Sequence, residues 1–189
     1  LDSKDIPHSP LSGGHIFDSR VAEDILSYLR VIMCPGEAGK KDFKRILNRP
    51  NKYLKNEILN QISSWNSLEK LIENPGLKDW EREKIIDFVT SLEYIQGLLD
   101  DIDISPRELL DIMVREVGLL DFYQDHSPMK DEVDTSDDKV MLEVLLSLAE
   151  NFYSPEEFYQ FAVKTREDFE YGLVEGYQED RESRSPDRD

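Results

Sequence analysis

Apolar residues recur at intervals of three and four along most of this chain, which is the spacing of one face of an α-helix. The clearest example follows residue 19, where the apolar positions are Val21, Ile25, Leu26, Leu29, Ile32 and Met33. Asp18 or Ser19 can cap this helix, and the Pro35-Gly36 pair is expected to end it. The pattern predicts a first helix that buries one apolar stripe.

The same spacing continues through the rest of the chain. A second, basic helix contains Phe43, Ile46 and Leu47 and should stop before Pro50, because proline disfavours helical geometry in the residue that precedes it. Further helices are predicted over residues 53–62, 66–72, 79–101, 106–117, 137–151 and 155–171. No alternating pattern is long enough for a convincing sheet. The chain is therefore predicted to be all-α, an irregular bundle of about seven to nine helices.

Local signals mark several of these helix ends. Asn66 and Glu69 form a plausible capping pair for the fourth helix. Ser105 and Ser154 each open a capping box with proline at the first helical position. Gly118 is expected to end the helix that begins after Ser105.

The composition suits a helical domain with a large solvated surface. Of the 189 residues, 39% are hydrophobic and 34% are charged, so each helix can bury one stripe and show the rest to water. The chain begins at Leu1, and we expect it to be a fragment of a larger protein. After Gly176 there is no aliphatic side chain to bury, so residues 176–189 are predicted to be a disordered tail or linker.

Two further features bear on the compartment. Cys34 is the single cysteine, which excludes an internal disulfide framework and fits a reducing environment. No apolar run approaches the roughly 18 residues that span a bilayer, and no signal-peptide pattern is present. A soluble, cytoplasmic protein without a membrane partner is predicted.

Charge is unevenly distributed along the chain. The formal net charge is −18, which argues against a general nucleic-acid binder because an acidic surface repels phosphate. Residues 37–55 are the exception, with seven basic residues against two acidic ones. The basic residues are Lys40, Lys41, Lys44, Arg45, Arg49, Lys52 and Lys55. This run is either a local anion-binding patch or an ordinary solvated helix face.

No catalytic or metal-binding arrangement is evident in the sequence. His8, His15 and His126 lack a second ligand at helix-face spacing. An acidic group at residues 131–138 lacks the glycine that an EF-hand loop needs at its sharp turn. There is no phosphate-cradling GxxxxGK[ST] loop and no local signature of a nucleophile with its base. The chain by itself is predicted to have no catalytic residue, no bound metal and no cofactor.

Several blocks of the sequence together resemble one enzyme family. The first is Ile-Pro at residues 6–7, a Gly-Gly turn at 13–14, and the run HIFDSRVAEDILSYLR at 15–30. The second is the basic helix and Asn-Arg-Pro at 43–50, with the segment that follows to residue 59. The third is MVREVGL at 113–119, followed by Tyr123. In this order and spacing the blocks are similar to the UvrD/Rep family of superfamily 1 DNA helicases.

The resemblance implies a division of the chain. Residues 1–34 would form the edge of the second motor (2A-like) domain, and residues 35–175 would form the helical 2B accessory domain inserted into it. Residues 176–189 would lead back to the motor, with hinges at Pro35-Gly36 and after Gly176. ATP and Mg²⁺ are expected only on the parent's motor domains, which would be partners within the same polypeptide. The parent is expected to be an ATP-dependent 3′–5′ helicase of DNA repair or recombination.

The resemblance also implies a DNA-binding site at the junction of double-stranded and single-stranded DNA. The family's 2B domain often has a Gly-Ile-Gly turn whose bare backbone approaches duplex phosphates. The matching positions here are Tyr53, Leu54 and Lys55, which lack glycine. Basic side chains would then bind phosphate instead. The candidate DNA-binding residues are Lys44, Arg45, Arg49, Lys52, Tyr53 and Lys55.

A different class of function also fits the sequence. Outside the basic run the chain is strongly acidic, which is typical of a helical protein–protein interaction module that meets a basic partner without contacting DNA. Salt-sensitive DNA binding would favour the helicase interpretation, whereas recovery of basic protein partners would favour this alternative.

Overall fold

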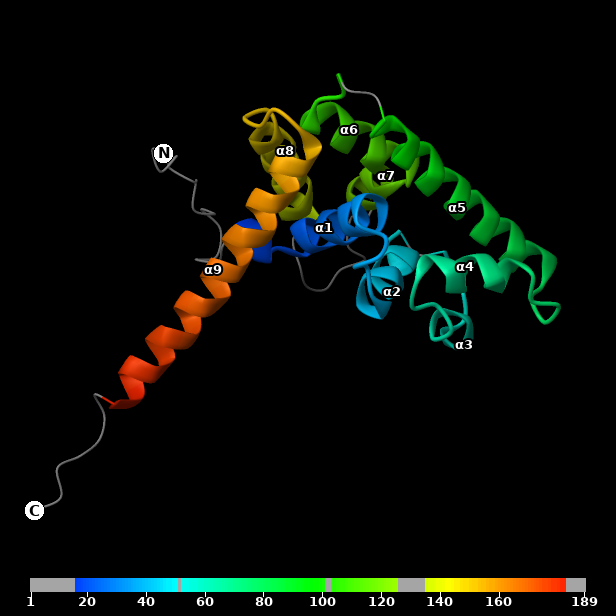
Figure 1. Cartoon of the computed structure of the whole chain (residues 1–189), viewed down its shortest axis with the longest axis horizontal. Helices are drawn as coiled ribbons and strands as arrows, with labels where there is room; N and C mark the ends of the chain where they lie inside the picture. Colours follow the sequence, from blue (N-terminus) through cyan, green and yellow to red (C-terminus); the bar gives the residue numbers. More distant parts are fainter. Residues whose placement is uncertain (1–15, 51, 101–102, 126–134, 183–189) are drawn as a thin grey trace, which may run out of the picture.

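The computed structural model describes residues 16–50, 52–100, 103–125 and 135–182 and confirms the all-α prediction (Figure 1). Within these residues there are nine α-helices, one 3-10 helix and no strand. The elements are η1 (Ile16–Asp18), α1 (Arg20–Met33), α2 (Lys40–Asn48), α3 (Asn56–Leu59), α4 (Trp65–Ile72), α5 (Asp79–Leu98), α6 (Pro106–Glu116), α7 (Leu119–Asp125), α8 (Thr135–Ala149) and α9 (Pro155–Glu182).

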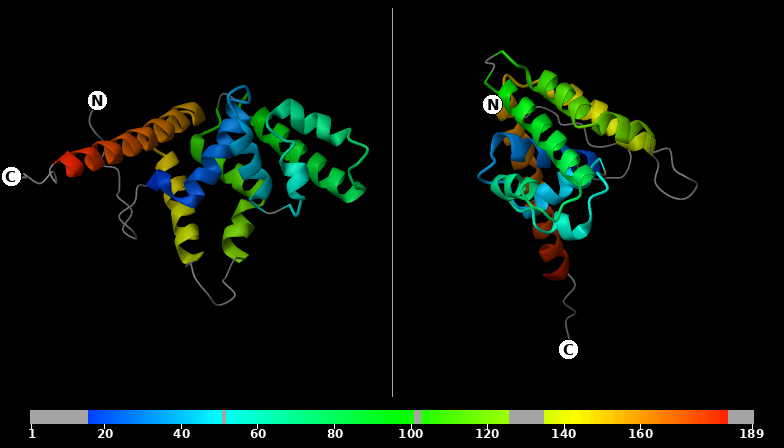
Figure 2. Two further views of the ribbon diagram at one scale, coloured as in Figure 1. Left: turned by 90° about the horizontal axis from the view of Figure 1, so that it is seen from below. Right: turned by 90° about the vertical axis from the view of Figure 1, so that its right-hand side faces the viewer.

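Helix α1 lies at the centre of the core. It packs against α2, α5, α8 and α9, and Val21, Tyr28 and Val31 on it are fully buried. Figures 1 and 2 show α2, α3 and α4 on one side of α1, α8 and the start of α9 on the other, and α9 running beyond the remaining helices. Because neighbours surround much of α1, a polar side chain that is buried on it must find a partner inside the protein.

The predicted start and end of α1 are confirmed. Ser19 is the N-cap residue, and its hydroxyl accepts a hydrogen bond from the backbone N–H of Ala22 at 3.2 Å. The helix ends at Met33, just before Cys34 and Pro35. The local sequence was sufficient to predict both ends of α1, because an N-cap serine and a helix-ending proline each act within about one helical turn.

The third helix is much shorter than predicted. The sequence predicts a helix over residues 53–62, but α3 spans only Asn56–Leu59. Tyr53 has a left-handed backbone with φ 58°, and Lys55 is extended, so neither continues a right-handed helix. The apolar positions Leu54, Ile58 and Ile62 are nevertheless buried, so the stripe was identified correctly and only its backbone geometry was wrong.

The cap of the fourth helix also differs from the prediction. Ser64, rather than Asn66, is the N-cap of α4 and accepts from the N–H of Ser67 at 3.2 Å. The hydroxyl of Ser67 accepts in turn from the N–H of Ser64 at 2.9 Å, which completes the capping box. Glu69 instead accepts a hydrogen bond from the Trp65 indole N–H at 3.0 Å. The sequence therefore contains two overlapping capping signals, Ser64 with Ser67 and Asn66 with Glu69, and the serine pair forms the cap.

The last helix is longer than predicted. The sequence predicts an end near residue 171 and a disordered or linking tail from residue 176, whereas α9 continues to Glu182. Residues 177–182 lack aliphatic side chains, but they also lack proline and glycine and include Glu, Gln and Arg, which favour helix. A segment without aliphatic side chains is not expected to pack against the core, but it can still remain helical. Residues 183–189 lie outside the described part of the chain.

Other predicted ends agree with the structure. Ser105 caps α6 by accepting from the N–H of Glu108, and Pro106 is the first helical residue. Gly118 follows α6 with φ 79°, a left-handed conformation that favours glycine. Among the described residues, none of the helices is long and apolar enough to cross a bilayer.

Candidate nucleic-acid interface

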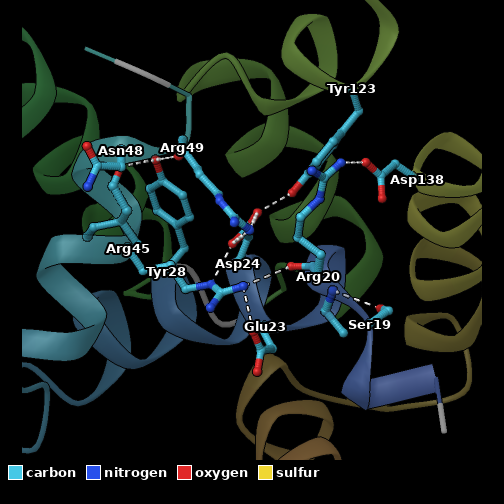
Figure 3. A network of polar contacts seen from close by, with 12 residues as sticks. Ser19, Arg20, Glu23, Asp24, Tyr28, Arg45, Asn48, Arg49, Tyr123 and Asp138 are labelled. Atoms are coloured by element: carbon cyan, nitrogen blue, oxygen red, sulfur yellow. Dashed lines mark hydrogen bonds and ion pairs between the residues drawn. The ribbon is translucent and has the colours of Figure 1, made fainter. Parts of the chain in front are cut away.

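Asp24 is a buried carboxylate at the centre of a polar cluster (Figure 3). Its side chain is 1% exposed and accepts hydrogen bonds from three side chains. Arg45 Nε on α2 lies 2.6 Å from Asp24 Oδ1, and Arg49 Nη1 lies 3.0 and 3.1 Å from the two oxygens. The hydroxyl of Tyr123 on α7 donates to Oδ2 at 2.7 Å. Both carboxylate oxygens are therefore paired, as a buried charge requires.

A second carboxylate extends this cluster towards α9. Glu23 Oε2 lies 2.6 Å from Arg45 Nη2, and Glu23 Oε1 lies 3.0 Å from Arg166 Nη2. At the start of α1, Arg20 forms an ion pair with Asp138 of α8. Through these contacts, charged side chains of α1 hold α2, α8 and α9 in a fixed arrangement.

Two of the predicted DNA-binding residues therefore point into the protein. Arg45 and Arg49 neutralise Asp24, and the side chain of Arg45 is only 18% exposed. Sequence reasoning did not identify Asp24 or Tyr123. The signal available was the position of Asp24, which lies three residues after Val21 and four before Tyr28, on the buried face of α1.

Tyr28 fixes the end of α2. Its fully buried hydroxyl lies 3.0 Å from the carbonyl oxygen of Ile46 and 2.8 Å from that of Arg49, and shares its hydrogen between them. These carbonyls have no partner within the helix, so a buried donor is needed there. Burial raises the pKa of Tyr28 well above its ordinary value, and the charge of Asp24 adds to this. Tyr28 is therefore a neutral donor at physiological pH.

Lys52 packs against the body of the protein. Its Nζ lies 4.5 Å from the centroid of the Phe88 ring on α5, in cation–π geometry. Burial, together with the nearby charge of Lys84, lowers the pKa of Lys52 to about 8. Lys52 is therefore a half-buried cation at the base of the turn.

The exposed part of the candidate site is smaller than the sequence suggested. Lys44 and Lys55 are exposed, and Tyr53 is 74% exposed between Lys52 and Leu54. The structure thus divides the six predicted residues into three groups: Arg45 and Arg49 directed inward, Lys52 half-buried, and Lys44, Tyr53 and Lys55 at the surface. We refer to residues 52–55 as the Tyr53 turn.

Tyr123 is held in the same environment as Tyr28. Burial raises the pKa of its hydroxyl, and the charge of Asp24 and the hydrogen bond to it act in the same direction. The hydrogen bond of this neutral phenol to a carboxylate is charge-assisted. Around Asp24, the cluster therefore combines Arg45, Arg49 and two un-ionised tyrosines.

In the part of the chain that the structure describes, no group of three or more His, Cys, Asp or Glu side chains is arranged to hold a metal ion. His8, His15, His126 and most of the acidic run at 131–138 lie outside the described side chains. The exposed part of the candidate DNA-binding site therefore consists of Lys44, Lys55 and Tyr53, without a metal site among the described side chains.

Comparison with known proteins adds no assignment. No protein-family model matches the chain, and no curated protein matches it either.

Proposed function

We propose that this chain is a 2B-like accessory domain of an ATP-dependent 3′–5′ DNA helicase of the UvrD/Rep type. The resemblance runs in order from residue 6 to Tyr123, and its blocks include α1, α2 and the Tyr53 turn. ATP and Mg²⁺ would bind to the motor domains of the parent protein. The role of this chain would be to contact duplex DNA near its junction with a single strand.

The observation that carries this proposal is the backbone of Tyr53. The resemblance aligns Tyr53 with the first glycine of the family's Gly-Ile-Gly turn, and Tyr53 has φ 58°, a conformation that glycine adopts readily and tyrosine rarely. A glycine-type backbone at the position that matches a glycine therefore supports the alignment.

The contacts around the turn support a division of roles. Asp24 accepts hydrogen bonds from the Arg49 guanidinium, and the Tyr28 hydroxyl donates to the Arg49 carbonyl oxygen. Arg45 and Arg49 would then position the turn, whereas the exposed Lys44 and Lys55 would bind phosphates. Charge on exposed, flexible lysines is the kind that gives weak, salt-dependent DNA binding.

The domain division belongs to the same proposal. Residues 1–34 would be the motor edge, residues 35–175 the 2B-like domain and residues 176–189 the linker. Helix α1 packs against α2, α5, α8 and α9, so the first two parts share one hydrophobic core.

Duplex binding at low salt tests the proposal. The double substitution Lys44→Glu/Lys55→Glu should weaken binding of a fluorescent duplex by at least about tenfold, because two phosphate contacts become repulsive. The matched control is Lys139→Glu/Lys164→Glu, which changes the net charge equally at exposed positions on α8 and α9. Equal losses in both variants would show that only overall charge matters and would exclude Lys44 and Lys55 as the phosphate-binding residues.

One observation favours the alternative function. Arg45 and Arg49 are neutralised internally, so the basic surface near residues 37–55 consists of exposed lysines on an otherwise acidic chain. The second candidate is therefore an acidic module that binds a basic protein partner. Failure of the wild-type chain to bind duplex DNA at low salt, with binding of a polylysine probe, would favour this candidate over the first.

A further inference from the structure

A cavity of about 600 Å³ lies where the ends of α1 and α5 meet the start of α9. Met33 and Leu99 line it from the ends of α1 and α5, and Ile104 lines it from just before α6. We refer to these three partly buried side chains as the apolar lining. Sites for small molecules in proteins typically have volumes of about 300–1,000 Å³ and are mostly apolar with a few polar groups.

The charged side chains that line this cavity are acidic. Glu37 in the connection between α1 and α2 and Glu156 in the first turn of α9 both line it, and both are exposed. Neither carboxylate forms an ion pair with a described side chain, and Glu156 accepts one hydrogen bond from Gln160 at 3.0 Å. No basic side chain is among the described residues of the lining. Two negative charges therefore lie in the lining without a counter-charge there.

Cys34 shows that the two carboxylates act on the same space. Its thiol is partly buried at the C-cap of α1 and lines the cavity. Burial raises the pKa of this thiol, and the charges of Glu37 and Glu156 act in the same direction, whereas the charge of Arg30 opposes them. Cys34 is therefore an un-ionised thiol at neutral pH and adds to the apolar part of the cavity.

The helix ends beside the cavity also favour a cation. Helices α1 and α5 end there, and the C-terminus of a helix carries a partial negative charge. At the opposite pole, the N-terminus of α9 already has Glu156 and Glu157 in its first turn. Arg30 is not part of the lining, because its guanidinium donates to the Tyr159 hydroxyl at 2.9 Å and lies 3.5 Å from Asp42.

We propose that this cavity binds an aliphatic ammonium compound, whose alkyl chain contacts the apolar lining and whose ammonium group pairs with Glu37 and Glu156. The two carboxylates would repel an anion of the same shape. The cavity shares no lining residue with the candidate DNA-binding site. The inference therefore goes beyond the proposed function and does not depend on it.

Binding of n-octylamine to the whole chain tests this proposal, with isothermal titration calorimetry as the measurement. Ethylamine keeps the charge but lacks most of the chain, so it should bind at least about tenfold more weakly, since each buried methylene contributes to affinity. Octanoate keeps an alkyl chain and carries the opposite charge, so it should not bind. Absence of octylamine binding to the wild type at millimolar concentration would overturn the proposal.

Substitution of the two carboxylates tests their role. Glu37→Gln/Glu156→Gln should weaken octylamine binding by about tenfold, because two ion pairs at exposed positions are lost. The matched control is Glu73→Gln/Glu83→Gln, which changes the net charge equally at exposed positions at the end of α4 and on α5 and should bind like the wild type. Equal affinity of Glu37→Gln/Glu156→Gln and the wild type would show that the carboxylates do not hold the ligand, and the proposal would fail.

Cys34 gives a second readout that needs no substitution. It is the single cysteine of the chain, so iodoacetamide reports on one thiol. Octylamine should slow alkylation of Cys34 severalfold, whereas ethylamine at the same concentration should not. An unchanged rate with octylamine would overturn the proposal. Protection by a lysine-rich peptide but not by octylamine would also overturn it, since the occupant would then be a segment of a basic protein partner.

Discussion

Arg49 donates from one guanidinium nitrogen to both carboxylate oxygens of Asp24, at 3.0 and 3.1 Å. The two residues are 25 positions apart in the sequence, and Asp24 is almost completely buried. Arg49 is also the C-cap residue of α2. A buried carboxylate on the central helix therefore holds the residue that ends α2.

Neutralising Asp24 should strongly destabilise the protein. In Asp24→Asn, the guanidinium groups of Arg45 and Arg49 lose their buried counter-charge, and the free energy of unfolding should fall by about 3–5 kcal/mol. Urea denaturation measures this change. The matched control is Asp87→Asn on the exposed face of α5, which should change the stability by less than about 0.5 kcal/mol. A loss below about 1 kcal/mol in Asp24→Asn would contradict a structural role for this carboxylate.

The Tyr123 hydroxyl should stabilise the protein through Asp24. Tyr123→Phe removes the donor that lies 2.7 Å from Asp24 Oδ2 and should cost about 1.5–3 kcal/mol, since the bond is to a charged group. The same substitution in an Asp24→Asn background should cost markedly less. A double-mutant cycle in urea measures the difference, and additive effects of the two substitutions would show that the residues are not coupled.

Lys52 should make the stability rise with pH above neutrality. The pKa of Lys52 is lowered to about 8 in the folded protein, whereas an unfolded lysine titrates near 10.5. Between these values the unfolded state binds more protons, so the free energy of unfolding increases as the pH rises from about 8 to 10. Lys52→Met should remove this increase and stabilise the protein at pH 7 by roughly 1–2 kcal/mol.

The control for this experiment is Lys44→Met, which changes an exposed lysine on α2. It should leave the increase between pH 8 and 10 unchanged. Denaturation curves for the three proteins at pH 7, 8, 9 and 10 make the comparison. A Lys52→Met variant that keeps the wild-type slope would indicate that Lys52 is solvated.

Above pH 10 the two buried tyrosines should act in the opposite direction. The pKa values of Tyr28 and Tyr123 are raised by burial and by Asp24, so both hydroxyls stay protonated in the folded state while unfolded tyrosines ionise near 10. The unfolded state then binds fewer protons, and stability falls as the pH rises above 10. Tyr28→Phe/Tyr123→Phe should be less stable at pH 8 but lose less between pH 10 and 11.

The control replaces two exposed tyrosines, as Tyr94→Phe/Tyr153→Phe. It should keep the wild-type stability at pH 8 and the wild-type loss above pH 10. Unfolding free energies at pH 8, 10 and 11 give the comparison. Equal losses in the wild type and in Tyr28→Phe/Tyr123→Phe would show that the alkaline instability arises elsewhere.

The sequence by itself determined the helical class and most helix positions. Apolar spacing and the serine caps at residues 19 and 105 act within one or two turns, so they are legible without the fold. The same local signals overestimated α3 and underestimated α9. Near α3, the apolar side chains are buried although the left-handed backbone of Tyr53 prevents a continuous helix. In α9, the helix continues through residues that have no aliphatic side chain to bury.

Only the tertiary structure decided what the basic residues do. A run of positive charge does not show which side chains meet a carboxylate more than 20 positions earlier in the chain. Packing of α1 against α2 directs Arg45 and Arg49 towards Asp24, and it leaves Lys44 and Lys55 at the surface. The physical reason is that helix formation depends on neighbours in sequence, whereas the pairing of buried charges depends on which faces meet in space.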